Sequence, residues 1–268
     1  GKMVMQAASQ NLTPVTLELG GKSPTIVSKK YDVSKAAEMI MSGKIMNAGQ
    51  VCLSPDYVFV PEAEMETFID VARNTFQGMF PTVSGNSDYV AVVNERHYQR
   101  ISGYIDEAKA AGTRVEPMSP DAYNAEEQRI PIHLVIDPAE SLKVMQDEIF
   151  GPVMIVKPYK ELDECINYIA DHPHPLGLYY FGDDKAEQKY VLEHTQSGGV
   201  TINDVLMHIS NIELPFGGVG NSGMGNYQGL EGFRTFSHAR SVYTQGWVNL
   251  PKLAGTMPPY NTEKLDKL

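Results

Sequence analysis

Val153-Met-Ile-Val156, Leu178-Tyr-Tyr-Phe181 and Gly199-Val-Thr-Ile202 are three short apolar runs within one continuous region of a 268-residue chain. Two stretches with helical composition, residues 161–170 and 184–195, separate them. Strands that alternate with helices of about 10–15 residues are typical of βαβ units, whose strands run parallel in one sheet. We therefore predict an α/β fold of three layers (α/β/α), in which helices cover both faces of a mostly parallel sheet.

The same alternation of strands and helices extends toward the N-terminus. Apolar runs predict strands at residues 23–28, 57–61 and 130–136. Apolar side chains at helical spacing predict helices between these strands. The first predicted helix runs from Asp32, which can cap its first turn, to about Asn47. The second covers residues 65–79, with Met79 on the core face, and the third ends at Gly112.

The domain organisation follows from the two ends of the sequence. The opening residues 1–8 have helical composition but no capping residue, so we expect that a longer protein contains this chain. Residues 241–245 are predicted to form the last strand, and the charged, proline-containing region from Pro251 is expected to be weakly ordered. We therefore predict one catalytic domain over residues 1–245 and a C-terminal tail over residues 246–268.

Charge and cysteine content limit the possible partners. The formal net charge of −11 disfavours nucleic acid and anionic membranes, because neither attracts an acidic protein. No apolar run approaches the roughly 18 residues that a membrane span needs, and no charged-then-apolar leader is present. Cys52 and Cys165 are the two cysteines of the sequence, so a disulfide framework is not expected and a reducing cytoplasm is.

Cys52 lies at the boundary between two predicted elements. In Asn47-Ala-Gly-Gln-Val-Cys52-Leu-Ser-Pro55, a helical pattern is interrupted at Gly49 and a strand follows the cysteine. Catalytic nucleophiles are often held on short loops between rigid elements. A lone cysteine is more often an inert thiol, so the assignment of Cys52 depends on motifs elsewhere in the chain. Cys165 stands inside a predicted helix and is interpreted as structural.

Two carboxylates occupy unusual positions in the sequence. Glu18 stands between two leucines at the end of a strand predicted from Thr13, and two glycines follow. An acid among apolar residues needs a partner or a function, although an outward-facing strand glutamate is an equally good interpretation. Glu148 belongs to the loop Asp147-Glu-Ile-Phe-Gly-Pro152, which leads into the strand predicted at Val153.

Three other patterns do not indicate a site. Gly218-Val-Gly-Asn-Ser-Gly223 matches the dinucleotide pattern G-x-G-x-x-G, but it does not follow a strand, and no acidic residue stands about 20 positions further on. The seven histidines do not fall at metal-ligand spacing, so no metal site is predicted. The sequence has no G-x-S-x-G motif, which argues against a serine hydrolase.

Three motifs taken together resemble the aldehyde dehydrogenase superfamily. They are Glu18-Leu-Gly-Gly-Lys22, Gly49-Gln-Val-Cys52 and Glu148-Ile-Phe-Gly-Pro152. The resemblance covers residues 11 to about 243, and the order and separation of the motifs make it specific.

Two further segments, residues 17–24 and 214–225, are similar to the class 3 branch of the family and, within it, to the bacterial coniferyl aldehyde dehydrogenases. Class 3 relatives often have Tyr-His-Gly-Lys where this chain has Tyr227-Gln-Gly-Leu230, near the expected mouth of the substrate site. The family's N-terminal NAD-binding domain has no counterpart in this sequence, nor has the asparagine that helps to hold the oxyanion. The resemblance implies a homodimer for the full-length protein.

The resemblance implies a role for two residues in the oxidation of an aldehyde. Cys52 is the nucleophile that adds to the carbonyl and later carries a thioester, which suits a soft sulfur atom. A free thiol has a pKa of about 8.5, so we expect local electrostatics to increase the thiolate fraction. Glu18 matches the general base that activates water for hydrolysis of the thioester, and an apolar setting should raise its pKa toward neutrality.

The resemblance also implies a nicotinamide dinucleotide as cofactor, NAD with NADP as the alternative. Glu148 matches the residue that holds the nicotinamide ribose hydroxyls, and Phe150 packs beside the nicotinamide. Leu19 is assigned to the same cofactor site, whereas Lys22 is interpreted as structural.

We thus predict an NAD(P)-dependent aldehyde dehydrogenase acting on an aromatic aldehyde such as coniferyl aldehyde, or on an aliphatic one. The 268-residue chain alone is expected to be inactive, because the cofactor domain is absent from it. Two alternatives remain. The chain as it stands could be an inert structural or oligomerising module, or it could belong to a relative that passes the thioester to coenzyme A. Glu18 argues against the second, because a base that activates water favours hydrolysis.

Overall fold

The structure is a computed structural model that describes residues 1–260. The chain divides into two compact units, Gly1–Thr235 and Phe236–Leu268. The first unit carries the strands of the described residues and all the predicted site residues. In the second unit the described part contains one short helix, α9 (Leu250–Ala254).

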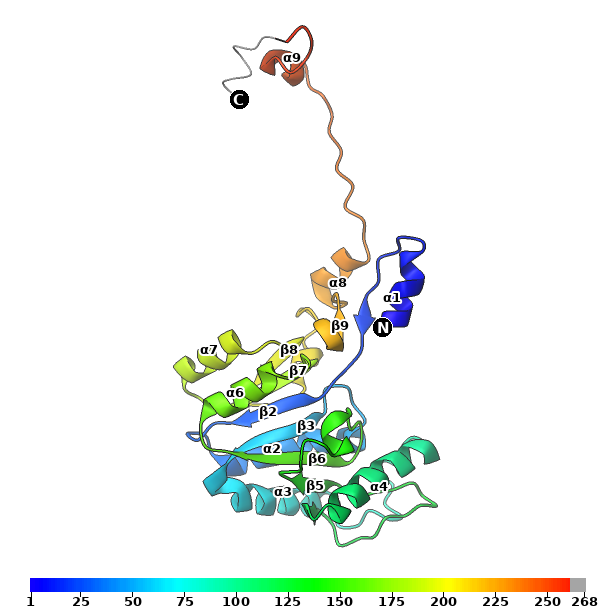
Figure 1. Cartoon of the computed structure of the whole chain (residues 1–268), viewed down its shortest axis with the longest axis vertical. Helices are drawn as coiled ribbons and strands as arrows, with labels where there is room; N and C mark the ends of the chain where they lie inside the picture. Colours follow the sequence, from blue (N-terminus) through cyan, green and yellow to red (C-terminus); the bar gives the residue numbers. More distant parts are fainter. Residues whose placement is uncertain (261–268) are drawn as a thin grey trace. The chain divides into compact units, whose positions relative to one another are not determined.

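Seven strands form one sheet in the order β4-β5-β6-β3-β2-β7-β8 (Figure 1). Neighbouring strands are parallel except β4 and β5, which pair antiparallel at one edge. The prediction of a mostly parallel sheet is therefore confirmed. The strands are β2 (Ser23–Val27), β3 (Pro55–Pro61), β4 (Arg114–Pro117), β5 (His133–Ile136), β6 (Val153–Tyr159), β7 (Gly177–Phe181) and β8 (Gly199–Ile202).

Alternate side chains of the strands enter two separate hydrophobic clusters, one on each face of the sheet. In β3, Val58 and Val60 belong to one cluster, while Tyr57 and Phe59 belong to the other. Burying each such side chain contributes about 1.5–3 kcal/mol. Helices cover both faces, which confirms the α/β/α fold (Figure 1). The first cluster is covered by α2 (Val33–Ile45) and α3 (Met65–Met79), the second by α4 (Glu95–Ala110), α5 (Lys143–Gln146), α6 (Leu162–Ala170) and α7 (Lys185–His194).

Side-chain caps fix where three of these helices begin. The carboxylates of Asp32 and Asp184 and the amide oxygen of Asn94 each accept hydrogen bonds from backbone N–H groups of the following first turn. Such caps stabilise a helix by about 1 kcal/mol each. Asp32 therefore starts α2 as predicted, although the helix ends at Ile45, before Asn47, because Asn47 and Ala48 have positive φ angles of 50° and 52°.

A second, two-stranded sheet lies outside the main one. β1 (Leu17–Glu18) pairs antiparallel with β9 (Gly223–Met224). The strand predicted from Thr13 is therefore reduced to its last two residues, since no strand of the described chain pairs with residues 13–16. The remaining helices of this unit are α1 (Lys2–Ser9), α8 (Gly229–Thr235) and the short 3₁₀ helices η1 (Met46–Gly49), η2 (Glu62–Glu64), η3 (Met207–Ser210) and η4 (Gly220–Ser222).

Three local predictions are wrong. Residues 241–245 form no strand: Val242 and Tyr243 are exposed, and a strand without a neighbour has no hydrogen-bonding ladder. Met79 is 48% exposed and stands at the last position of α3. The strand expected at residues 130–136 begins only at His133, although its apolar residues are buried.

Part of the predicted tail lies outside the described residues, namely residues 261–268. Within residues 1–260, no helix is long and apolar enough to cross a membrane.

Candidate active site

The predicted site residues gather at the N-terminal ends of adjacent parallel strands. Gly20 and Gly21 lead into β2, Cys52 precedes β3, and Glu148 precedes β6. Since β6, β3 and β2 are neighbours in the sheet, the loops that lead into them meet at one edge. Ligands of open α/β sheets usually bind at the opposite, C-terminal ends of the strands, so this arrangement differs from the common one.

The side chain of Gln50 anchors the first half of the Cys52 loop, residues 50–54. Its amide nitrogen donates to the carbonyl oxygens of Asn47 and Ala91 at 3.0 and 3.1 Å. Its amide oxygen accepts from the Val93 N–H at 2.9 Å. With both ends of the amide bonded, Gln50 ties the cysteine loop to the segment that precedes α4.

Two further side chains hold the second half of this loop. The Tyr179 hydroxyl donates to the carbonyl oxygen of Leu53, and the Lys44 ammonium group donates to that of Pro55 at 3.0 Å. Both donors are buried, in a region where hydrogen bonds are not weakened by competition with water. The backbone on each side of Cys52 is thus fixed by neighbouring secondary structure.

Gly49 is required where the Cys52 loop contacts the Glu148 loop. Its φ angle is +73°, and a Cβ atom there would overlap the carbonyl oxygen of Gly151. We expect Gly49→Ala to lower the free energy of unfolding by about 2–4 kcal/mol, from left-handed backbone strain and overpacking together. Chemical denaturation checks this. Gly103→Ala in α4 is the matched control, since a Cβ there meets open space and should be neutral or stabilising. Equal stability of the two variants would contradict the packing argument.

The electrostatic environment of Cys52 opposes ionisation of the thiol. Burial raises the pKa of Cys52, and the negative charges of Glu18 and Glu148 raise it further. Hydrogen bonding to the backbone N–H groups of Cys52 and Leu53 lowers the pKa, but by less. The expectation that local charges increase the thiolate fraction is therefore wrong for the described residues, because both nearby carboxylates repel a thiolate. Proton removal from Cys52 then depends on a base.

Glu18 lies where β1 meets the glycine-rich segment 214–225. Burial raises the pKa of its carboxyl group, in agreement with the expectation, and the hydroxyl of Tyr227 partly opposes this shift. The segment supports β1 through its backbone: the Leu19 N–H donates to the Ser222 carbonyl oxygen at 3.0 Å, and Gly223 pairs with Glu18. A Cβ atom at Gly223 would overlap the backbone of β1. These glycines therefore permit close backbone packing.

A partly buried ion pair supports the Glu148 loop. The Lys22 ammonium group pairs with Asp56 and also donates to the carbonyl oxygens of Val144 and Asp147, both at 2.8 Å. The second oxygen of Asp56 accepts from the Ile149 N–H at 3.0 Å. Lys22 thus joins β2, β3 and the loop, which supports its structural interpretation.

Side chains of α4 also form hydrogen bonds to the Glu148 loop. The Arg100 guanidinium group donates to the Ile149 carbonyl oxygen at 2.8 Å and to the Tyr104 hydroxyl at 3.1 Å. The Tyr104 hydroxyl in turn donates to the Asp147 carboxylate at 2.8 Å. The backbone around Glu148 is therefore fixed from both sides.

The side chains assigned to a cofactor lie at the surface of this framework. Burial raises the pKa of Glu148 to about 7, because it disfavours the charged form of the carboxyl group. Gly20 makes room for it, since a Cβ there would lie 2.9 Å from Oε1 of Glu148. Phe150, with a φ of 45°, and Leu19 both leave apolar side chains partly exposed, at 40% and 42%.

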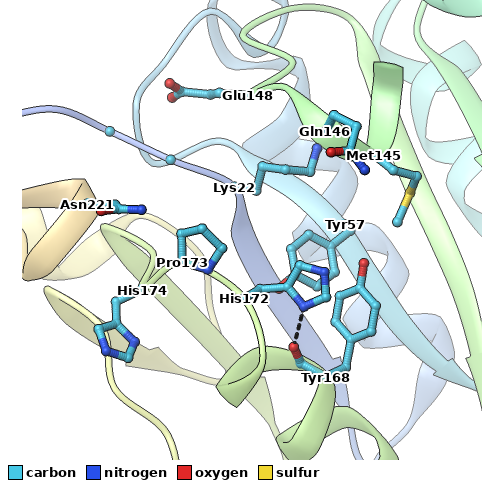
Figure 2. Close-up of a pocket in the computed structure, with 12 residues that line it drawn as sticks. Lys22, Tyr57, Met145, Gln146, Glu148, Tyr168, His172, Pro173, His174 and Asn221 are labelled. Atoms are coloured by element: carbon cyan, nitrogen blue, oxygen red, sulfur yellow. Dashed lines mark hydrogen bonds between the residues drawn. The ribbon is translucent and has the colours of Figure 1, made fainter. Parts of the chain in front are cut away.

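A cavity of about 290 Å³ opens beside Gly20, Gly21 and Glu148 (Figure 2). The rings of Tyr57 and Tyr168 meet edge to face at a centroid distance of 5.6 Å. Neither Cys52 nor Glu18 is among the residues that line this cavity.

His172 and His174, which lie between α6 and β7, also line this cavity. His172 stacks on Tyr168 with ring centroids 4.0 Å apart. No group of three or more histidine, cysteine or acidic residues placed to hold a metal ion occurs within residues 1–260.

Sequence reasoning missed the residues that hold the site loops. The buried position of Lys44 could have been predicted from the sequence, because it follows Ile40 and Met41 at helical spacing on the buried face of α2. The roles of Gln50 and Arg100 could not have been predicted in this way, since their partners are distant in sequence and are brought near only by the fold.

Comparison with known proteins identifies the family. Residues 1–242 match the aldehyde dehydrogenase family. A probable coniferyl aldehyde dehydrogenase of Caulobacter vibrioides is 50% identical over 97% of this chain and 54% of its own length. A dimeric NADP-preferring aldehyde dehydrogenase of the rat is 40% identical over 97% of this chain and 56% of its own length. The chain belongs to the aldehyde dehydrogenase family.

Solved structures agree with this assignment. The AldH protein of Staphylococcus aureus in a substrate-bound state superposes with a TM-score of 0.90 and 37% identity, covering 100% of this chain and 57% of that one. An aldehyde dehydrogenase of Mycobacterium tuberculosis in complex with NAD⁺ superposes with a TM-score of 0.80 and 25% identity, over 93% of this chain and 52% of the other. The chain thus spans about half the length of the relatives that it matches.

Proposed function

We propose that the protein containing this chain oxidises an aldehyde to the carboxylic acid through a thioester on Cys52. One observation carries the proposal: Gly49 before Cys52 packs against Gly151 of the Glu148 loop, and Gly20, two residues after Glu18, packs against the Glu148 carboxylate, so that a nucleophile and two carboxylates share one site. Their raised pKa values have burial as the largest cause, which is typical of groups held ready for proton transfer.

In the first half of the proposed reaction the Cys52 sulfur adds to the carbonyl carbon of the aldehyde. Because the thiol pKa is raised, its proton must pass to a neighbouring base as the carbon–sulfur bond forms. Glu18 is the carboxylate that suits this task, since its own raised pKa brings it closer to that of a thiol. The loop contacts of Gln50 and Tyr179 hold the sulfur in place during the addition.

Before the second half Glu18 passes the thiol proton to solvent and is a carboxylate again. It then takes a proton from water, and the resulting hydroxide character allows the oxygen to attack the thioester carbon. The carbon–sulfur bond breaks, the acid leaves, and Cys52 is regenerated as a thiolate. A base with a pKa raised toward neutrality accepts a proton from water more readily than an ordinary glutamate does.

The chain's own residues fit one end of a nicotinamide dinucleotide. Among the described residues no side chain hydrogen-bonds the Glu148 carboxylate, and a hydrogen bond from the Gly21 backbone still leaves acceptor capacity for sugar hydroxyls. Leu19 and Phe150 offer exposed apolar surface for a flat ring. When bound, the dinucleotide would accept the hydride lost from the aldehyde carbon. The NAD⁺ complex of the Mycobacterium relative supports NAD, and the name of the rat relative keeps NADP as the alternative.

The substrate class and assembly are proposed from the relatives. The coniferyl aldehyde dehydrogenases among them support an aromatic aldehyde such as coniferyl aldehyde as substrate. The word "dimeric" in the name of the rat enzyme supports a class 3-like homodimer. Both cysteines are free, which is consistent with the cytoplasm. We retain residues 1–245 as the catalytic domain and 246–268 as a tail.

The function is tested in a protein extended to the relatives' length by the half of the Caulobacter relative that this chain does not match. This extended protein should form NADH or NADPH with coniferyl aldehyde, and Cys52→Ala should remove turnover, because no other side chain supplies the thioester. Cys165→Ala is the matched control and should keep the activity. Full activity of Cys52→Ala would contradict the proposal. The 268-residue chain alone is expected to be inactive.

A further inference from the structure

Lys44 is a buried cation that the proposed reaction does not use. Its side chain lies on the core face of α2 and is 1% exposed. The ammonium group donates one hydrogen bond, to the Pro55 carbonyl oxygen at 3.0 Å, and among the described residues it forms no salt bridge.

Keeping a lysine at this position is costly. Transferring an ammonium group from water to the interior opposes folding by several kcal/mol, and an apolar side chain of similar shape avoids that penalty. Burial lowers the pKa of Lys44 to about 8, while the negative charges of Asp56 and Glu148 favour its charged form. A lysine in such a place therefore needs a role that methionine or leucine would not fulfil.

The position of Lys44 in the chain suggests this role. It precedes Cys52 in α2 and bonds to Pro55, the first residue of β3, so its side chain bridges the two ends of the cysteine loop. Its Cε atom also packs against Gly49, 3.1 Å from where a Cβ would stand. Gly49 in turn contacts Gly151, directly after Phe150. The cysteine loop and the Glu148–Phe150 loop thus meet at this side chain.

We propose that Lys44 is a positioning residue that holds the Cys52 sulfur in register with the Glu148–Phe150 loop. The inference deepens the proposed function, because it takes Cys52 to be the reacting group. Lys44 acts through the backbone on both sides of Cys52. Without its hydrogen bond, the loop should move outward and carry the thiol from its half-buried position toward solvent.

The experiment measures the alkylation of Cys52 by iodoacetamide in the 268-residue chain as a function of pH, with site-specific readout by mass spectrometry. Lys44→Met removes the donor with little change of shape, and Lys44→Gln is too short to reach Pro55. Burial is the largest cause of the raised thiol pKa, so both variants should lower the apparent pKa of Cys52 and speed alkylation at pH 7 at least about threefold. Lys35→Met, on the exposed face of the same helix, is the control and should match the wild type.

If Lys44 only stabilised the fold, its substitution would lower the unfolding temperature and leave the pH profile of Cys52 alkylation unchanged. An unchanged profile in both variants, or slower alkylation, would therefore overturn the proposal. Buried Cys165 reports on folding in the same experiment, because it should stay unlabelled in a folded chain. If Cys165 becomes labelled in Lys44→Met, the pH profile of Lys44→Gln decides whether the proposal holds. The measurement involves no aldehyde, so failure of the proposed oxidation and failure of this inference are distinguishable.

Discussion

Glu18→Gln in the extended protein is expected to give a rapid burst of about one equivalent of reduced cofactor, followed by turnover roughly 10²–10⁴-fold slower than in the wild type. An amide has no proton-accepting function at neutral pH, so water is no longer activated and the thioester on Cys52 persists. Addition of the thiol to the aldehyde is impaired less, because buffer bases can reach a half-buried sulfur. Stopped-flow absorbance of the reduced cofactor separates the two phases.

The matched control is Glu38→Gln, which makes the same chemical change on the exposed side of α2 and should keep wild-type turnover. Trapping the intact protein by acid quench and mass spectrometry should show the acyl group on Cys52 in the Glu18 variant. Loss of the burst together with turnover would mean that buffer bases cannot replace Glu18 in the addition step, and it would contradict the expected separation of the two phases.

The pH dependence of the wild-type enzyme follows from the raised pKa of Glu18. The base must be deprotonated, so deacylation should be lost as the pH falls through a value above the ordinary range of a glutamate. Burial, the largest cause of the shift, disfavours the charged form, and this fixes the sign.

Iodoacetamide is expected to label Cys52 at least about 100-fold faster than Cys165 in the folded chain. Cys165 is 0% exposed within α6, and burial raises its pKa strongly, so reagent reaches it only through opening of the fold. Cys52 is partly exposed and lies on a loop. Brief labelling and peptide mapping measure the ratio, and labelling in denaturant, where both thiols should react alike, is the control. Preferential labelling of Cys165 in the folded chain would contradict the assignment of both cysteines.

The labelling rate also carries information on charge. The pKa of Cys52 is raised by burial and by Glu18 and Glu148, so the rise of its alkylation rate with pH should be centred at a higher pH than that of an ordinary thiol. In the Glu18→Gln variant this profile should shift toward lower pH, because one repelling carboxylate is removed. A profile that does not respond to Glu18 would mean that the two groups do not share a site.

The sequence by itself determined the three-layer architecture. Strand and helix periods are local properties, because side chains two apart share a face of a strand and those three or four apart share a face of a helix. The runs at β6, β7 and β8 could therefore be predicted as parallel strands with helices between them. Cys52 and Glu18 stood out as polar residues where a regular pattern ends, but their expected roles came from the resemblance of the motifs around them to a known family.

Only the tertiary structure decided what these residues experience. The neighbours of β3 in the sheet bring the Cys52 and Glu148 loops together, and no local pattern encodes that order. The sign of the thiol shift was missed for this reason, since it depends on two carboxylates that lie far away in sequence. The prediction of a strand at residues 241–245 was wrong for the same reason, because a strand exists only where another strand supplies its hydrogen bonds. Periodicity is encoded locally, whereas burial and charge at a site come from partners that only the folded chain assembles.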